Sequence, residues 1–198
     1  MRDARRCRVA AGGLIQVFSG GDNLDCICRM NEMNTPELII TPELFCHGVA
    51  VEALGADAFG PGRFTRTAFR LREGVAHENE LSFVALRDNQ LVGSVRITRI
   101  LIGERPALVL GPLVVEASCK NEGIGRKLMT VAVEAARSQG HELIILVGDE
   151  PYYRPFGFKR VTNGQITLPG PVDPRRFLYC ELQEGAIGQF HGPARACR

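Results

Sequence analysis

Residues 108–158 read LVLGPLVVEASCKNEGIGRKLMTVAVEAARSQGHELIILVGDEPYYRPFGF. This pattern predicts a strand, a glycine-containing loop, a helix, a second strand and a compact aromatic turn, in that order. The helix is expected to begin near Ile124, because apolar residues recur from there at helical spacing, and to end near Gly140. The order places an anion-binding loop beside tyrosines that can donate a proton, which indicates a cofactor-dependent enzyme.

The first strand of this stretch contains the dipeptide Gly111-Pro112. Proline cannot donate a hydrogen bond to a neighbouring strand, and glycine has no side chain to pack. The dipeptide therefore predicts a β-bulge, with free backbone groups that can bind an extended ligand, and an ordinary edge strand is the alternative.

The loop before the helix contains Gly123 and Gly125, which allow a ligand to approach the backbone closely. The first amides of a helix have no partner inside it and bind phosphate well. Lys120, Arg126 and Lys127 surround this helix start, where each cation opposes the helix dipole by about 0.3–1 kcal/mol. A bound polyanion would reverse that cost, so the loop predicts a phosphate site, with solvated surface charges as the alternative.

The loop does not fit two common phosphate motifs. A P-loop needs Gly-Lys followed by Ser or Thr, and the chain has no such sequence. A dinucleotide fingerprint needs a third glycine where this chain has Leu128. Asp149 ends the next strand, where an acid could bind a ribose, so dinucleotide binding stays open as a weaker alternative.

Composition narrows the class of protein. The chain has 198 residues and a net charge of +2, so it lacks the basic field that nucleic-acid binding usually needs. No apolar run approaches the roughly 18 residues of a membrane span. Its seven cysteines are irregularly spaced and assemble no metal set with four histidines, so we expect reduced thiols, a cytoplasmic location and no bound metal.

The rest of the chain is expected to form one domain. Residues 1–34 have no sustained periodicity and predict a leader outside the fold, whereas residues 35–198 predict a single domain. Thr41 and Pro42 have the pattern of a helix start, and that helix should run to about Ala58. Residues 63–73 predict a second helix, an antiparallel hairpin should follow it, and the tail after Ala186 is expected to be peripheral.

Two motifs resemble those of the GNAT N-acetyltransferase superfamily. Lys120-x-x-Gly123-x-Gly125 resembles its Q/R-x-x-G-x-G/A signature, and it lies between a strand and the long helix, as in the family. Tyr153-x-x-x-Gly157-Phe158 resembles the family's Tyr-x-x-x-Gly-Phe turn. The two motifs flank one strand–helix–strand unit in the family's order, and the resemblance covers about residues 37–183.

The resemblance implies an α/β (α+β) fold of three layers, with a mixed, splayed sheet and helices on both faces. It implies acetyl-CoA as co-substrate, whose pantetheine arm would pair with the bulged strand and whose pyrophosphate would rest on the loop amides. The residues expected to bind it are Leu113, Val114, Val115, Lys120, Asn121, Glu122, Gly123, Ile124, Gly125 and Arg126. Tyr153 falls on the position of the family's general acid, and a one-residue shift would place Tyr152 there.

The chain departs from the family pattern at two points. Lysine stands at position 120 in place of Gln or Arg, and residues 148–151 lack the asparagine often found ahead of the tyrosine turn. No general base is evident in the sequence. The carboxylates that could serve are Glu52, Glu80, Glu116 and Glu150, each also readable as a surface charge, whereas His77 and His141 are expected to be exposed.

These observations predict an N-acetyltransferase that moves an acetyl group from acetyl-CoA to a primary amine by direct attack. The alternative is a non-catalytic acyl-CoA-binding module of the same fold. The acceptor would be a small-molecule or peptide amine, no nucleic acid or membrane partner is expected, and a homodimer stays open. Four arginines could attract an acidic acceptor, but a solvated helix face is the expected explanation; they are Arg63, Arg66, Arg70 and Arg72.

Overall fold

The computed structural model describes residues 37–62 and 67–197. Its strands are β1 (Leu38–Pro42), β2 (Phe83–Arg87), β3 (Gln90–Ile102), β4 (Arg105–Val115), β5 (Leu143–Val147), β6 (Lys159–Arg160), β7 (Ile166–Thr167), β8 (Phe177–Glu181) and β9 (Gly192–Ala196). The main sheet has the order β1-β2-β3-β4-β5-β8-β6, and only β4 and β5 are parallel neighbours along it. The sheet is therefore mixed, as expected.

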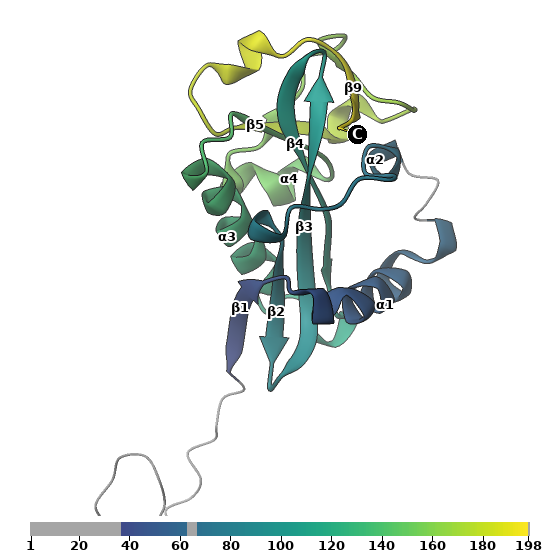
Figure 1. Cartoon of the computed structure of the whole chain (residues 1–198), viewed down its shortest axis with the longest axis vertical. Helices are drawn as coiled ribbons and strands as arrows, with labels where there is room; N and C mark the ends of the chain where they lie inside the picture. Colours follow the sequence, from purple (N-terminus) through teal and green to yellow (C-terminus); the bar gives the residue numbers. More distant parts are fainter. Residues whose placement is uncertain (1–36, 63–66, 198) are drawn as a thin grey trace, which may run out of the picture. The chain divides into compact units, whose positions relative to one another are not determined.

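Helices cover both faces of this sheet (Figure 1). They are α1 (Gly48–Phe59), α2 (Thr67–Arg70), α3 (Ile124–Ser138) and α4 (Glu150–Tyr153), with 3-10 turns at Phe45–His47, Asn79–Leu81, Ala117–Cys119, Arg154–Phe156, Pro174–Arg176 and Ala186–Gln189. Ile97 of β3 packs in the core under α3, whereas the adjacent Arg96 and Thr98 line a cavity together with Val51 of α1. Successive side chains of a strand point to opposite faces, so α1 and α3 lie on opposite sides of the sheet.

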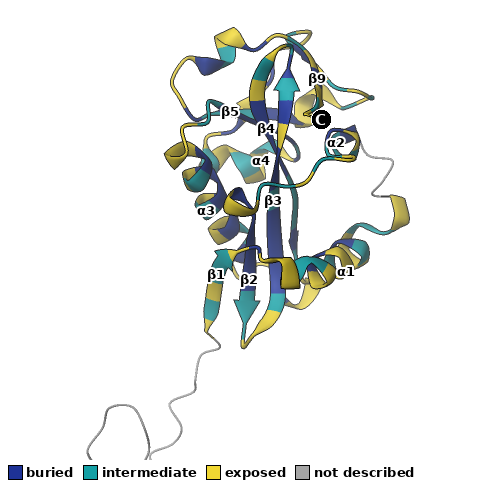
Figure 2. Cartoon of the chain, viewed as in Figure 1, coloured by how far each residue is buried: buried dark blue, intermediate teal, exposed yellow. Residues whose placement is uncertain are grey.

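The core has two parts, one on each face, because neighbouring buried residues of a strand pack in different clusters. Figure 2 shows buried residues in dark blue along the middle of the sheet. Leu108 and Leu110 of β4 pack toward α3, whereas Val109 packs in the second cluster. Leu128 is fully buried on the apolar face of α3. The helical spacing predicted for residues 124–135 is therefore confirmed, and it fixes α3 against the sheet.

The start of the first helix was predicted wrongly. Thr41 and Pro42 lie in β1, where they pair with Val84 and Phe83 of β2, and α1 begins only at Gly48. Pro42 is tolerated because β1 is an edge strand. Pairing with β2 overrides the local capping pattern here. Of the predicted second helix, residues 67–70 are helical, whereas residues 63–66 lie outside the described part of the chain.

The tail after Ala186 packs into the core, so the expectation of a peripheral tail was wrong. Phe190 is fully buried in the second core cluster, and the Arg105 guanidinium lies 5.3 Å from the centre of its ring. β9 pairs with the far end of β3, where Ile100 lies opposite Ala196. The tail thereby closes the sheet beyond the end of β2.

The leader predicted for residues 1–34 lies outside the described residues, and the single domain predicted for residues 35–198 stays a prediction. Cys46, Cys119, Cys180 and Cys197 are free thiols. Within residues 37–62 and 67–197 no helix is long and apolar enough to cross a membrane. The same residues contain no cluster of three or more His, Cys, Asp or Glu side chains that could hold a metal ion.

Candidate active site

The bulge predicted at Gly111-Pro112 is present in β4. Val95 of β3 lies opposite Leu113, whereas Ile97 lies opposite Leu110, so two residues of β4 face Arg96 alone. Gly111 has φ 129°, a conformation that other residues rarely adopt. The bulge bends β4 at the point where the strand leaves its neighbour β5.

Beyond the bulge, one edge of β4 has no strand beside it in the described structure. β4 pairs with β5 only at Leu108 and Val109. Residues 113–115 continue to pair with β3 on the other side. The backbone groups on the free edge of residues 113–115 can therefore bond an extended ligand, as an added strand would.

The glycine loop opens α3 as predicted. Gly123 is left-handed, with φ 80°, and its carbonyl accepts the amide hydrogen of Lys127 at 3.0 Å. Asn121, with φ 67°, makes the other sharp bend of the loop. The first amides of α3 point outward from the helix, which gives an anion the partners that the helix cannot supply.

The charge of Glu122 does not oppose an anion at this loop. Its carboxylate pairs with the Arg87 guanidinium of β2, and that hydrogen bond holds the pKa of Glu122 below its usual range. Lys120 is exposed and lines the adjoining cavity, and Arg126 is exposed in the first turn. The loop surface is therefore cationic where the helix amides emerge.

The two tyrosines of α4 occupy different places. The Tyr153 ring packs on Gly148 at the end of β5 and makes an edge contact with Phe158, with ring centres 5.8 Å apart. The Tyr152 hydroxyl instead lies over Gly125, where an added Cβ would be 2.6 Å from it. Tyr152 thus lies at the glycine loop, and Tyr153 lies at the splay between β4 and β5.

Both phenols stay protonated at neutral pH. Burial, helped by Tyr152 and Asp149, raises the pKa of Tyr153 to about 12, against the opposing effect of Arg176. Burial also raises the pKa of Tyr152, and Arg126 acts in the opposite direction. Each hydroxyl can therefore donate a proton to a strong base formed beside it.

A cavity of about 970 Å³ joins these parts. At one end it is lined by Leu113, Val115, Lys120, Tyr152 and Tyr153. The other residues predicted to bind the cofactor contribute no side chain to its lining. Val114 and Ile124 are buried, Asn121 and Glu122 are exposed, and Gly123, Gly125 and Arg126 form the adjoining helix start.

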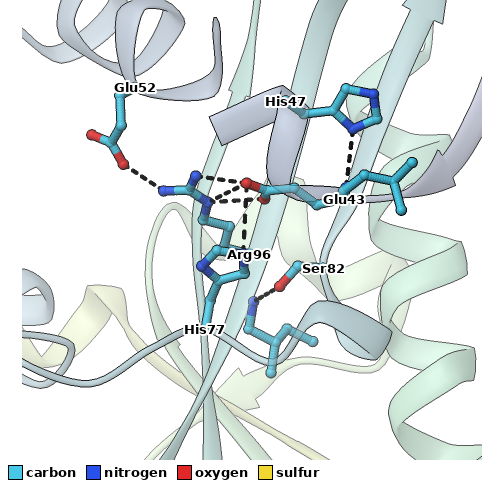
Figure 3. A network of polar contacts seen from close by, with 8 residues as sticks. Glu43, His47, Glu52, His77, Ser82 and Arg96 are labelled. Carbon is cyan, nitrogen blue, oxygen red and sulfur yellow. Dashed lines mark hydrogen bonds and ion pairs between the residues drawn. The ribbon is translucent and has the colours of Figure 1, made fainter. Parts of the chain in front are cut away.

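At its other end the cavity is lined by side chains of α1, α2, the turn after α2 and β3, including Glu52, Arg72, His77 and Arg96. Figure 3 shows the polar network there. The buried Glu43 carboxylate accepts hydrogen bonds from Arg96 Nε at 2.9 Å and Nη2 at 2.6 Å, and Arg96 Nη1 donates to Glu52 at 2.5 Å. Sequence reasoning missed this network, although an arginine at position 96, between the buried Val95 and Ile97 of a largely apolar strand, was a signal for it.

His77 is half-buried in this end of the cavity, so the expectation of an exposed side chain was wrong. Its Nε2 lies 3.6 Å from the Glu43 carboxylate. Burial lowers the pKa of His77. The nearby Glu43 raises this pKa, and Arg96 lowers it further. His141 is also half-buried, and burial lowers its pKa, but its side chain does not line the cavity.

Of the four carboxylates considered as general bases, only Glu52 lines the cavity. Glu80 accepts a hydrogen bond from Gln139, and Glu116 accepts one from Ser118. Glu150 pairs with Arg154 and Arg160. Those three belong to surface interactions away from this cavity.

The residues of the dinucleotide alternative have other contacts. Asp149 lies 3.0 Å from the Arg176 Nε atom. Leu128, at the position of the third glycine, is fully buried in the core under α3. The helix therefore packs through a leucine where a dinucleotide fold needs close backbone contact.

Three solved structures of GNAT family acetyltransferases have a similar fold. The Escherichia coli GNAT family N-acetyltransferase YhbS, in complex with CoA, is 20% identical, with a TM-score of 0.70 over 82% of this chain and 91% of that one. A GNAT family acetyltransferase from Brucella melitensis, in complex with acetyl-CoA, is 26% identical, with a TM-score of 0.55 over 76% and 98% of the two chains. A GNAT family acetyltransferase from Staphylococcus aureus is 17% identical, with a TM-score of 0.55 over 74% and 100%.

No curated protein sequence matches the chain at a significant level. The model of the acetyltransferase (GNAT) family matches residues 49–158, which include the bulged strand, the glycine loop and the tyrosine turn. The match spans more than half of the chain and ends at the Phe158 of the predicted motif. The chain therefore belongs to the GNAT acetyltransferase family and is an acyltransferase.

Proposed function

We propose that this chain transfers an acetyl group from acetyl-CoA to a primary amine by direct attack of the amine on the thioester. The observation that carries the proposal is one cavity that joins the free edge of β4 to the half-buried Tyr153 phenol and opens beside the start of α3. These are the three requirements of the reaction: an edge for an extended arm, amides for a pyrophosphate and a proton donor for the thiolate.

Backbone groups would hold the co-substrate. The free edge of Leu113, Val114 and Val115 suits the amides of a pantetheine arm. The amides of residues 121–126 suit a pyrophosphate, and Lys120 adds a positive charge beside them. The side chains of Val114 and Ile124 are buried, so we expect these two residues to act through their backbone alone.

Tyr153 is the proposed general acid. When the amine nitrogen bonds to the acetyl carbon and the carbon–sulfur bond breaks, the electron pair of that bond leaves on sulfur. The resulting thiolate takes the Tyr153 hydroxyl proton, the new amide nitrogen gives up its extra proton to solvent, and a proton from solvent restores the phenol. A backbone N–H near Val114 or Val115 would stabilise the carbonyl oxygen during the step. The alternative donor, Tyr152, lies over Gly125, which favours a place beside the pyrophosphate.

The attacking amine must first lose a proton, and we propose His77 as its acceptor. His77 lines the cavity, and its lowered pKa keeps the imidazole neutral at pH 7, with Glu43, Arg96, Glu52 and Glu78 as the charges around it. In the variant His77→Gln, kcat/KM should fall and its decline at acidic pH should disappear. An unchanged pH profile would contradict this role and favour Glu52 or water.

Thermal unfolding with acetyl-CoA, and with NADH as the control ligand, tests the binding step. A ligand at 100 times its Kd adds about 2.7 kcal/mol, which for a chain of this size raises Tm by roughly 5–10 °C. We expect a shift with acetyl-CoA alone. No shift with acetyl-CoA would contradict the proposal, and a shift with NADH would favour the dinucleotide alternative.

Release of CoA thiol in the presence of an amine panel tests the transfer step. Turnover should require both acetyl-CoA and an amine, and it should be faster than hydrolysis without an amine. Tight acetyl-CoA binding without turnover on any amine or peptide would support the non-catalytic module instead.

A further inference from the structure

Arg72, in the turn after α2, is a half-buried cation whose hydrogen bonds are incomplete. Its Nε donates to the carbonyl of Ala68 at 3.1 Å, in the turn before it. Its Nη1 is buried and has no hydrogen-bond partner within the described structure. Buried polar groups are almost always paired because an unpaired one destabilises the fold, so this atom indicates a missing partner.

The unpaired atom lies beside the reaction centre of the proposed mechanism. Arg72 lines the cavity, and a Cβ placed on Gly111 would be 3.5 Å from Arg72 Nη1. Gly111 is the residue at which β4 bulges and separates from β5. The guanidinium therefore lies at the bend that separates the two ends of the cavity, on the side lined by α1 and α2.

The carboxylates that line the cavity already have arginine partners. Glu52 pairs with Arg96, Asp149 pairs with Arg176, and Asp173 pairs with Arg175. Among the described residues, Arg72 has no carboxylate partner. The protein thus supplies a cation at this point without supplying its counter-ion.

Arg72 keeps its charge despite burial. Burial, with the nearby Arg96, lowers the pKa of Arg72 to about 10, and Glu52 acts in the opposite direction. The group is therefore protonated at neutral pH. By contrast, Arg70 is exposed and donates to the Pro169 carbonyl, so only one of these two arginines fits the expected solvated face.

We propose that the acceptor is a small amine that also carries a carboxylate or phosphate group, and that Arg72 binds this anionic group. A guanidinium presents parallel N–H groups that match the oxygens of either anion. The anion would orient the acceptor so that its amine faces the bulge of β4. This inference rests on the proposed function, whose co-substrate it leaves unchanged.

Matched pairs of amines test the proposal, with kcat/KM measured for each member at saturating acetyl-CoA. The pairs are lysine and cadaverine, tyrosine and tyramine, and phosphoethanolamine and ethanolamine. In each productive pair the anionic member should be favoured by about 10- to 100-fold, the range expected for hydrogen bonds to a charged group. The first two pairs test a carboxylate, and the third tests a phosphate.

The variants Arg72→Gln and Arg70→Gln separate binding from a structural effect. In Arg72→Gln the preference for the anionic member should disappear while the Kd for acetyl-CoA stays within about twofold, whereas Arg70→Gln should keep the preference. Arg72→Lys keeps the charge and should retain part of the preference, which preserves the test if the glutamine variant does not fold. A preference for the neutral amines, or one unchanged in Arg72→Gln, would overturn the proposal.

Equilibrium binding separates failure of this inference from failure of the proposed function. The same amines are titrated into the wild-type chain without acetyl-CoA and followed by calorimetry. Binding of an anionic amine that Arg72→Gln loses supports the site even if no transfer occurs. Transfer without any anion preference would overturn this inference and leave the proposed reaction in place.

Discussion

The two ends of the cavity recognise ligands in different ways. At the end lined by β4 and α4, beside the start of α3, the main features are backbone groups: the free edge of residues 113–115 and the amides after Gly123. At the other end they are side chains from distant segments, among them Arg72, His77 and Arg96. Backbone recognition requires glycines at fixed spacing and so leaves a readable motif, whereas side-chain recognition depends on contacts that no local pattern encodes.

The largest effect should come from Tyr153, at the end of the cavity that is lined by β4 and α4. In the variant Tyr153→Phe we expect kcat to fall by about 100-fold or more, since general acid catalysis contributes about 10²- to 10⁴-fold. The ring contact with Phe158 does not use the hydroxyl, so the Kd for acetyl-CoA should hold. Steady-state kinetics on an accepted amine, combined with calorimetry, provide the measurement.

Tyr152→Phe is the matched control, because Tyr152 belongs to the same short helix and is also protonated at neutral pH. Its kcat should stay within a few-fold of the wild-type value. If Tyr152→Phe has the larger loss of kcat, the proton donor is Tyr152, and the assignment of the motif is shifted by one residue.

The motif end could be predicted from sequence because each feature there has a local cause. Gly111-Pro112 predicted the bulge, and Gly123 and Gly125 predicted the open helix start. The two tyrosines also lie where the turn motif predicted them, although they belong to a short helix, α4, that the sequence did not predict. The sequence left open whether Tyr153 or Tyr152 is the proton donor. Which phenol lies over Gly125 depends on how α4 packs against α3.

The acceptor end could not be predicted because its contacts are long-range. Glu43 and Arg96 are 53 residues apart, and Arg72 looked like one of several arginines on a solvated helix. The same reason explains the tail, whose glycines and proline hide a strand that pairs with β3 and a phenylalanine that fills the core. Burial decided each of these cases, and it emerges only when the sheet is assembled.

The next largest effect should be on stability, at the other end of the cavity, which is formed by side chains from distant segments. In the variant Arg96→Met the buried Glu43 carboxylate loses its arginine partner, and breaking a buried pair costs about 3–5 kcal/mol. At this chain length that lowers Tm by roughly 6–20 °C. Calorimetric unfolding measures the shift. Below its Tm, the folded Arg96→Met variant should bind acetyl-CoA as the wild-type chain does.

Glu52→Gln is its control, since this carboxylate bonds to the same arginine but is 61% exposed. Exposed pairs contribute about 0–1 kcal/mol, so its Tm should change by only a few degrees. Equal losses in the two variants would mean that Glu43 is not the residue that depends on Arg96.

A smaller effect should follow from adding a methyl group at the start of α3. In the variant Gly125→Ala the new Cβ would lie 2.6 Å from the Tyr152 hydroxyl, which can rotate away, so the fold should persist. Alanine even favours the helix by about 1 kcal/mol. We nevertheless expect acetyl-CoA to bind about tenfold more weakly, the equivalent of one charged hydrogen bond.

Gly48→Ala is the same substitution at the start of α1, where no atom lies within 4 Å of the new Cβ. It should leave acetyl-CoA binding unchanged. If both alanine variants bind acetyl-CoA as the wild-type chain does, the glycine loop is structural, and recognition by backbone would lose its main support.

The smallest effect should come from Lys120, the one position of the glycine motif where this chain departs from the family pattern. A lysine binds phosphate as a point charge, without the planar fork of arginine, so removing it should cost less than removing a backbone amide. In Lys120→Gln we expect the Kd for acetyl-CoA to rise about 3- to 5-fold at low salt, and the difference should shrink as salt screens the charge. Lys127→Gln, which is also exposed at the start of α3 but does not line the cavity, should change the Kd by less. Equal changes in the two variants would mean that Lys120 acts only through the general field of the loop, and that this end of the cavity recognises its ligand through backbone alone.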